Sequence, residues 1–234
     1  MKVKNYLPLW LYEPIVTIYN RYVNKFYQKS YAQEGEDLIL YRMIYGKIDK
    51  GFYVDVGAHH PKRFSNTYFF YKKGWRGINI EPMPGNKQIF DKYRPRDTNL
   101  EIPISSKEEE LIYYIFNDPA LNGFSKDLSL QRNELSDYKI IKTINMRTKT
   151  LRSILDRYLP IGQKIDFLSI DVEGLDMEVL ISNDWEKYRP EYILIEDKDF
   201  DFVTHESLEI YNFICKMSYK LMAKTLSTSI FKIK

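Results

Sequence analysis

Carboxylate side chains lie at the ends of four apolar, β-forming segments of this sequence, and they are the residues best suited to chemistry. Two of these positions lie late in the chain, where Asp171 and Glu173 follow one segment and Glu196 and Asp197 follow the next. Neighbouring strand ends would crowd these acids, and their repulsion is relieved by a cation or by shared protons. Because oxygen ligands suit Mg²⁺, Asp171, Glu196 and Asp197 are candidate metal ligands.

Catalysis without a metal is the alternative. The candidate catalytic residues are Glu173, Asp171 and His59, and either Glu173 or His59 can serve as the general base that takes a proton from an acceptor hydroxyl. A bound divalent ion would instead acidify that hydroxyl. Helix capping alone accounts for Asp171 and Glu173 but leaves Glu196 and Asp197 unexplained. The sequence leaves both mechanisms open.

The two earlier acidic positions have the spacing of a nucleoside site. After Asp55, Gly57 permits a tight turn and a close approach of the backbone to a ligand. A dinucleotide fold would place further glycines where His59 and the residues after it stand, so nicotinamide and flavin cofactors are disfavoured. Glu81 comes one βα unit later, where a carboxylate can accept hydrogen bonds from both hydroxyls of a ribose.

An alternation of short apolar segments with helical segments positions these residues. It predicts an α/β fold with a mostly parallel sheet, helices on both faces and an antiparallel C-terminal hairpin at the sheet edge. The predicted strands span residues 51–57, 75–81, 99–104, 165–171 and 192–196, and the hairpin spans 219–225 and 229–233. The predicted helices span residues 31–44, 61–73, 84–93, 150–158, 175–182 and 206–217.

The alternation breaks between residues 110 and 150. Two β-segments, 111–116 and 139–146, flank a polar stretch, and we interpret residues 116–138 as a lid-like insertion. Long segments of this kind inside a compact domain are usually either functional or mobile.

The first 29 residues form a predicted amphipathic helical segment, separate from a domain of residues 30–234. The segment is too polar to cross a bilayer and has no secretory cleavage pattern. We favour its packing on the domain or on a second subunit of a homo-oligomer. Docking to a membrane surface through Trp10 and the basic residues is the alternative.

Composition excludes several classes of protein. The 35 basic and 32 acidic residues are well mixed, without the basic stripe of a nucleic-acid binder. The single cysteine, Cys215, rules out an intramolecular disulfide and favours a cytoplasmic setting.

Five stretches of the sequence together resemble the FkbM methyltransferase family. They are YAQEGED (31–37), GFYVDVGAHHP (51–61), WRGINIEP (75–82), FNDPALN (116–122) and DFLSIDVEG (166–174). The resemblance implies a Rossmann-like, seven-stranded class I methyltransferase with S-adenosylmethionine as the methyl donor. It also implies O-methylation of a sugar or related small molecule, as in polysaccharide biosynthesis.

The resemblance also implies roles for individual residues. Asp55, Gly57 and Ala58 would form the cofactor turn, Glu81 would hold the ribose, Ser105 would lie near the adenine, and Gln33 to Asp37 would border the same cleft. Asp171 would complete this set. The late acids also look like the magnesium-binding cluster of certain sugar O-methyltransferases. The cofactor residues are thus Gln33, Asp37, Asp55, Gly57, Ala58, Glu81, Ser105 and Asp171.

Two other functions compete with this interpretation. One is a nucleotide-sugar or dinucleotide enzyme on a doubly wound sheet, which the missing glycine pattern disfavours. The other is a binding module that has lost catalysis, against which the four acidic strand ends argue.

Overall fold

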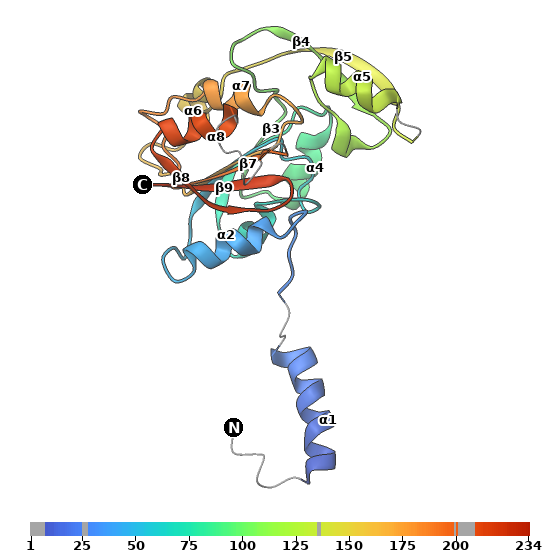
Figure 1. The fold of residues 1–234 in the computed structure, drawn as a ribbon, viewed down its shortest axis with the longest axis vertical. Coiled ribbons are helices and arrows are strands. Elements are labelled where there is room, and N and C mark those ends of the chain that lie inside the picture. Colours follow the sequence, from blue (N-terminus) through green and yellow to red (C-terminus); the bar gives the residue numbers. More distant parts are fainter. Residues whose placement is uncertain (1–7, 25–27, 135–136, 199, 201–208) are drawn as a thin grey trace. The chain divides into compact units, whose positions relative to one another are not determined.

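The computed structural model describes residues 8–24, 28–134, 137–198, 200 and 209–234. It divides into two compact units, Met1–Ser30 and Tyr31–Lys234 (Figure 1). The predicted N-terminal helix, insertion and last helix each extend into residues outside this description, namely 1–7 and 25–27, 135–136, and 206–208.

A seven-stranded sheet organises the larger unit, with the order β3-β2-β1-β6-β7-β9-β8. β9 runs antiparallel to both neighbours, and the pairings among β3, β2, β1, β6 and β7 are parallel. The strands are β1 (Phe52–Val56), β2 (Arg76–Ile80), β3 (Thr98–Leu100), β6 (Phe167–Ile170), β7 (Tyr192–Glu196), β8 (Tyr219–Lys224) and β9 (Thr228–Ile233). The predicted mostly parallel sheet and its C-terminal hairpin are confirmed.

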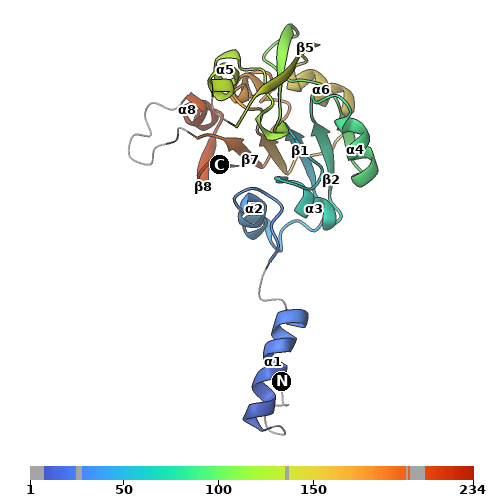
Figure 2. The same ribbon diagram turned by 90° about the vertical axis from the view of Figure 1, so that its right-hand side faces the viewer.

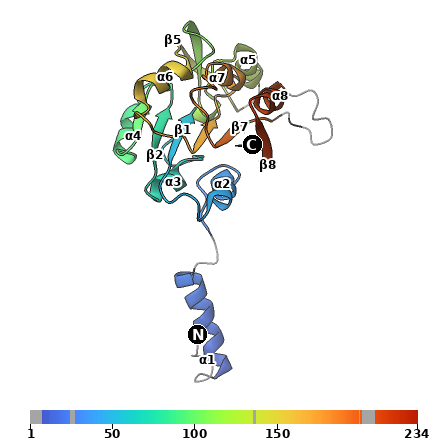
Figure 3. The ribbon, with the colours of Figure 1, turned by 90° about the vertical axis from the view of Figure 1, so that its left-hand side faces the viewer.

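Helices cover both faces of this sheet (Figures 2 and 3). Val54 and Val56 of β1 pack on the side of α6, α7 and α8, whereas Tyr53 packs with Leu40 and Phe70 on the side of α2 and α3. The central strands are therefore buried on both faces and read as nearly continuous apolar runs. The helices are α2 (Glu36–Ile44), α3 (Tyr68–Lys72), α4 (Asn86–Tyr93), α6 (Leu151–Tyr158), α7 (Asp176–Ile181) and α8 (Glu209–Lys216).

Two elements are shorter than predicted. The helix expected over residues 61–73 is reduced to α3, because Phe64 has a left-handed backbone (φ 53°) and the Ser65 hydroxyl accepts a hydrogen bond from the N–H of Tyr68. The strand expected over 99–104 ends at Leu100, and Ile104 forms only an isolated bridge.

The insertion has its own secondary structure. The predicted β-segments pair with each other as β4 (Glu110–Phe116) and β5 (Ile140–Arg147), in a two-stranded antiparallel sheet separate from the main one. A 3₁₀ turn, η3 (Pro119–Leu121), and a helix, α5 (Lys126–Glu134), lie between them in the chain (Figure 1).

The N-terminal unit contains an α-helix, α1 (Leu9–Tyr19), continued by a π-helical turn, η2 (Asn20–Asn24). Its large apolar side chains are exposed, with Trp10 at 74% and Tyr22 at 67% of their maximal accessible area. None of the helices in the described part of the chain has the length and hydrophobicity needed to cross a membrane.

Candidate active site

The strand order reverses between β1 and β6, since the chain proceeds from β1 towards β3 on one side and from β6 towards β7 on the other. Ligands of open α/β sheets bind beyond the carboxyl ends of the strands at such a point. A cavity lies here, with about 870 Å³ of empty space including its open mouth. Of the predicted site residues, its wall contains Gln33, Asp55, Gly57, Ala58, His59, Glu81, Asp171 and Glu173.

Gly57 forms the sharp turn after β1. Its φ is +79°, and a Cβ atom placed on it would lie 1.7 Å from the backbone oxygen of Asp171. The N–H groups of Gly57 and Ala58 both donate to the backbone oxygen of Ile80, at 2.9 and 3.1 Å. The turn is thus held against the ends of both β2 and β6, and only glycine fits it.

Glu81 follows β2 and is 7% exposed. Its two carboxylate oxygens accept hydrogen bonds from the backbone N–H groups of His59 (2.7 Å) and Met83 (2.9 Å). Burial raises the pKa of Glu81 to about 7, and repulsion from Asp55 contributes to the increase. A carboxylate has about four acceptor positions, so this one retains capacity for a ribose.

The late acids form a cluster at the ends of β6 and β7. Asp171, Glu173 and Glu196 each place an oxygen within 4.8 Å of the others. Asp171 lines the cavity and is exposed towards it, while the surrounding protein removes part of the solvation of its carboxyl. This desolvation raises the pKa of Asp171 well above its usual range, and repulsion from Glu196 and Glu173 raises it further.

Two basic side chains of the same chain contact this cluster. Arg132 of α5 donates a hydrogen bond to Glu173, and the Lys198 ammonium lies 2.5 Å from Glu196 and 3.6 Å from Glu173. Our sequence reasoning missed both. Lys198 stands two residues after Glu196, so a search for basic residues beside acidic strand ends would have found it. Arg132 belongs to the insertion, and no local pattern links it to Glu173.

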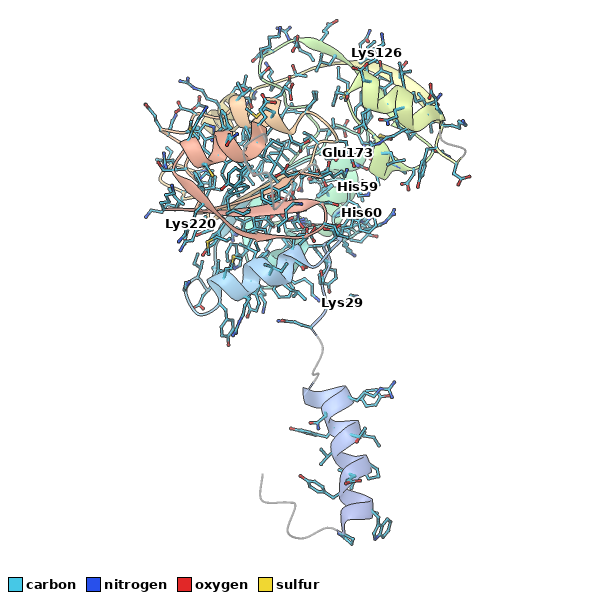
Figure 4. The ribbon with its side chains drawn as sticks, in the orientation of Figure 1. Lys29, His59, His60, Lys126, Glu173 and Lys220 are labelled. Atoms are coloured by element: carbon cyan, nitrogen blue, oxygen red, sulfur yellow. The ribbon has the colours of Figure 1, made fainter. Side chains whose placement is uncertain are left out.

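His59 presents a ring suited to accepting a proton. It lines the cavity, and its imidazole lies parallel to Phe64 with ring centroids 6.3 Å apart. Within the described residues, the ring makes no hydrogen bond. Burial lowers the pKa of His59, so the ring is neutral at pH 7. Figure 4 shows His59 and Glu173 at the same edge of the sheet, next to the insertion.

The structure does not bring four predicted residues to the cavity wall. Glu196 is one of them, although it belongs to the acidic cluster; the others are Asp37, Asp197 and Ser105. Asp37 accepts a hydrogen bond from the N–H of Tyr31 and so stabilises the start of α2. The Asp197 carboxylate accepts from the Ser229 hydroxyl of β9 and lies outside the acidic cluster. Ser105 is buried, and its backbone bonds to Lys149, while Ile104 lines the cavity.

The insertion and the strand β4 that precedes it supply part of the wall. Tyr113 of β4 and Phe124 line the cavity, with ring centroids 4.7 Å apart. A Cβ atom on Gly123 would lie 3.1 Å from the backbone oxygen of Glu173, so the insertion packs closely on the loop that follows β6. The aromatic contribution from β4 was not evident in the sequence.

This sheet order, with its single-glycine turn and acidic strand ends around one cavity, defines an α/β enzyme of the class I methyltransferase type. A family model described as the methyltransferase FkbM domain matches residues 55–221, which is more than half of the chain. The protein therefore belongs to the FkbM methyltransferase family and is an S-adenosylmethionine-dependent methyltransferase.

Two solved structures are similar to the chain. One is a TehB-like SAM-dependent methyltransferase from Corynebacterium glutamicum, with 9% identity, a TM-score of 0.41, and coverage of 97% of this chain and 100% of that one. The other is phosphoethanolamine N-methyltransferase 1 of Haemonchus contortus, with 8% identity and a TM-score of 0.36, where the alignment covers 95% of this chain and 44% of that one. No curated protein sequence matches.

Proposed function

We propose that this enzyme transfers the methyl group of S-adenosylmethionine to a hydroxyl group of a saccharide or a related small molecule. One observation supports the proposal: the wall of a single cavity contains the Gly57 turn, Glu81, and the acids Asp171 and Glu173. A nucleoside cofactor and an acceptor hydroxyl both find suitable partners there.

The donor lies over Gly57 in this proposal. The ribose hydroxyls donate to the Glu81 carboxylate, and the ammonium group of the methionine moiety lies near Asp55. Asp171 and Glu173 follow the neighbouring strand β6 and line the same cavity, so they would hold the acceptor hydroxyl beside the methyl group that the donor supplies. The insertion borders the cavity through Phe124.

The acceptor proton passes to a side chain of the protein. His59 is the base that the geometry favours, since its ring is neutral and lines the cavity. Glu173 is engaged by Arg132 and Lys198, so its oxygens are less available to an acceptor hydroxyl. Asp171, with its raised pKa, is suited to share a proton or to orient the hydroxyl.

The experiment is a transfer assay with isotopically labelled S-adenosylmethionine and a panel of saccharides and small alcohols, with products assigned by NMR. We expect the label in an O-methyl group. Transfer to nitrogen or carbon acceptors alone would contradict hydroxyl methylation. A wild-type protein that does not bind the donor in calorimetry, but gains thermal stability from a dinucleotide, would favour the doubly wound nucleotide enzyme.

Full activity is expected in excess EDTA. Arg132 and Lys198 place two positive charges against Glu173 and Glu196, which offsets the repulsion within the cluster without a metal. The measurement is the initial rate with EDTA alone and with added Mg²⁺. Loss of activity that Mg²⁺ restores would instead support a magnesium site at Asp171, Glu173 and Glu196.

Removal of residues 1–30 is expected to leave the donor affinity within about twofold, because all described cavity residues belong to the unit from Tyr31 onward. The exposed Trp10 and Tyr22 give that segment a separate docking role in our proposal, in a cytoplasmic setting. Sedimentation of the full chain with anionic liposomes, compared with the truncated chain, tests membrane docking. Sedimentation velocity without lipid tests a second copy as the partner. A large loss of donor affinity on truncation would contradict the separation of roles.

A further inference from the structure

A buried polar network occupies the sheet face covered by α2 and α3, next to the donor cavity. At its centre is Arg94, the residue that follows α4, which is completely buried. Its Nε donates to Asp97 at 2.8 Å, and both side chains are 0% exposed. The Tyr53 hydroxyl accepts from Arg94 Nη2 at 2.6 Å and donates to Asp97 at 2.7 Å.

Stability is a weak explanation for such a pair. Moving an arginine and an aspartate out of water is energetically costly, and well-packed apolar residues of similar size often give equal stability. The contacts of Arg94 beyond Asp97 are therefore informative. Its Nη1 donates to the Thr67 hydroxyl at 2.9 Å, and Thr67 in turn donates to Asp55 Oδ2 at 2.6 Å.

The direction of these two hydrogen bonds follows from their chemistry. A guanidinium group only donates, so the Thr67 oxygen must accept from it. The single hydroxyl proton of Thr67 is then directed to Asp55 Oδ2, an arrangement that suits an ionised carboxylate. The Ser65 hydroxyl lies 3.2 Å from the Thr67 hydroxyl and can donate a hydrogen bond to it, which agrees with these hydrogen-bond directions. The network thus favours an ionised Asp55 in one orientation.

Asp55 is the point where this network reaches the cavity wall. Burial raises the pKa of Asp55, whereas the Thr67 hydrogen bond and the charge of Arg94 lower it. The other charged groups that act on it are Asp97 and Glu81, both of which oppose its ionisation. The positive charge of Arg94 offsets the repulsion of these two carboxylates on Asp55.

We propose that Arg94 is a positioning residue for the methyl donor, which acts through Thr67 to hold the Asp55 carboxylate charged and oriented towards the donor's ammonium group. This inference rests on the proposed donor site. It assigns a function to Arg94 and Thr67, which do not line the cavity. That function concerns the amino-acid end of the donor and not its nucleoside end.

The test compares two ligands in calorimetry with the full chain. S-Adenosylhomocysteine carries the amino-acid end, whereas 5′-deoxy-5′-methylthioadenosine has the same nucleoside and sulfur without it. Thr67→Val keeps the side-chain volume and removes the hydroxyl. We expect this substitution to lower the affinity for S-adenosylhomocysteine about tenfold, which is the effect of a lost charge-assisted hydrogen bond. The affinity for 5′-deoxy-5′-methylthioadenosine should change less than twofold. Thr67→Ser should restore wild-type affinity.

Thr148→Val is the matched control, because Thr148 is equally buried and hydrogen-bonded but lies outside the cavity wall. It should change neither affinity. Equal weakening of both ligands by Thr67→Val, no weakening, or no rescue by serine would overturn the inference. Wild-type protein that binds neither ligand would contradict the proposed donor site itself. If Thr67→Val does not fold, Arg94→Lys keeps the charge, loses the fork to Thr67, and should give the same ligand-selective loss.

Discussion

Gly57→Ala is expected to abolish detectable binding of S-adenosylmethionine and to lower the free energy of unfolding by about 3 kcal/mol or more. The new Cβ would lie 1.7 Å from the backbone oxygen of Asp171, and this neighbour is main chain that cannot rotate away. Relief of the clash must separate the ends of β1 and β6, which are the elements that form the donor site. Calorimetry and urea denaturation measure the two effects.

Gly74→Ala is the control for backbone strain. Gly74 also has a left-handed φ, +92°, but its added Cβ would meet no atom within 4 Å. This variant should lose about 1 kcal/mol of stability and bind the donor normally. If Gly57→Ala binds as tightly as Gly74→Ala, the close approach of the turn to the β6 loop is not part of the donor site.

Glu81→Ala is expected to weaken donor binding about 100-fold or more. The substitution removes the acceptor of two ribose hydroxyls, each worth about 1.5–3 kcal/mol when the acceptor is charged, and it leaves the N–H groups of His59 and Met83 without their partner. Glu101→Gln is the control, because Glu101 accepts from Gly85 nearby but lies outside the cavity wall. Undiminished affinity of Glu81→Ala in calorimetry would contradict the ribose assignment.

The ionisation of Glu81 also predicts a pH dependence of the same binding. Ribose hydroxyls donate best to the carboxylate, so donor affinity should rise with pH up to about 7 and then level off. Stability follows the opposite direction. Since the pKa of Glu81 lies above its usual 4.5 in the folded state, its contribution to stability is complete below pH 4.5 and is lost as the pH rises through about 7. Glu81→Gln should remove both dependences.

The alternation of apolar segments and helices determined the architecture, since a strand buried on both faces has a distinct apolar signature. The glycine after β1 and the acids at the ends of β1, β2 and β6 were recognisable for a related reason. Residues next to the ends of parallel strands must meet at one edge of the sheet, whatever packs around them. For this reason Asp55, Gly57, Glu81 and Asp171 reached the same cavity.

Side-chain direction at the strand ends depended on the tertiary structure. Successive residues of a strand point to opposite faces, so Glu196 and Asp197 could not both join the acidic cluster, and Asp197 meets Ser229 instead. Pro61 and the residues after it read as a helix, but the left-handed Phe64 delays the helix until Tyr68.

The sequence by itself determined the succession of strands and helices along the chain and the identity of the residues at the strand ends, because these depend on hydrophobic periodicity and on local backbone requirements. Only the tertiary structure decided which charges meet. Arg132 reaches Glu173 across 41 residues, and Arg94 reaches Thr67 across 27. Contacts of this range leave no periodic trace in the chain, since they arise from the packing of whole elements.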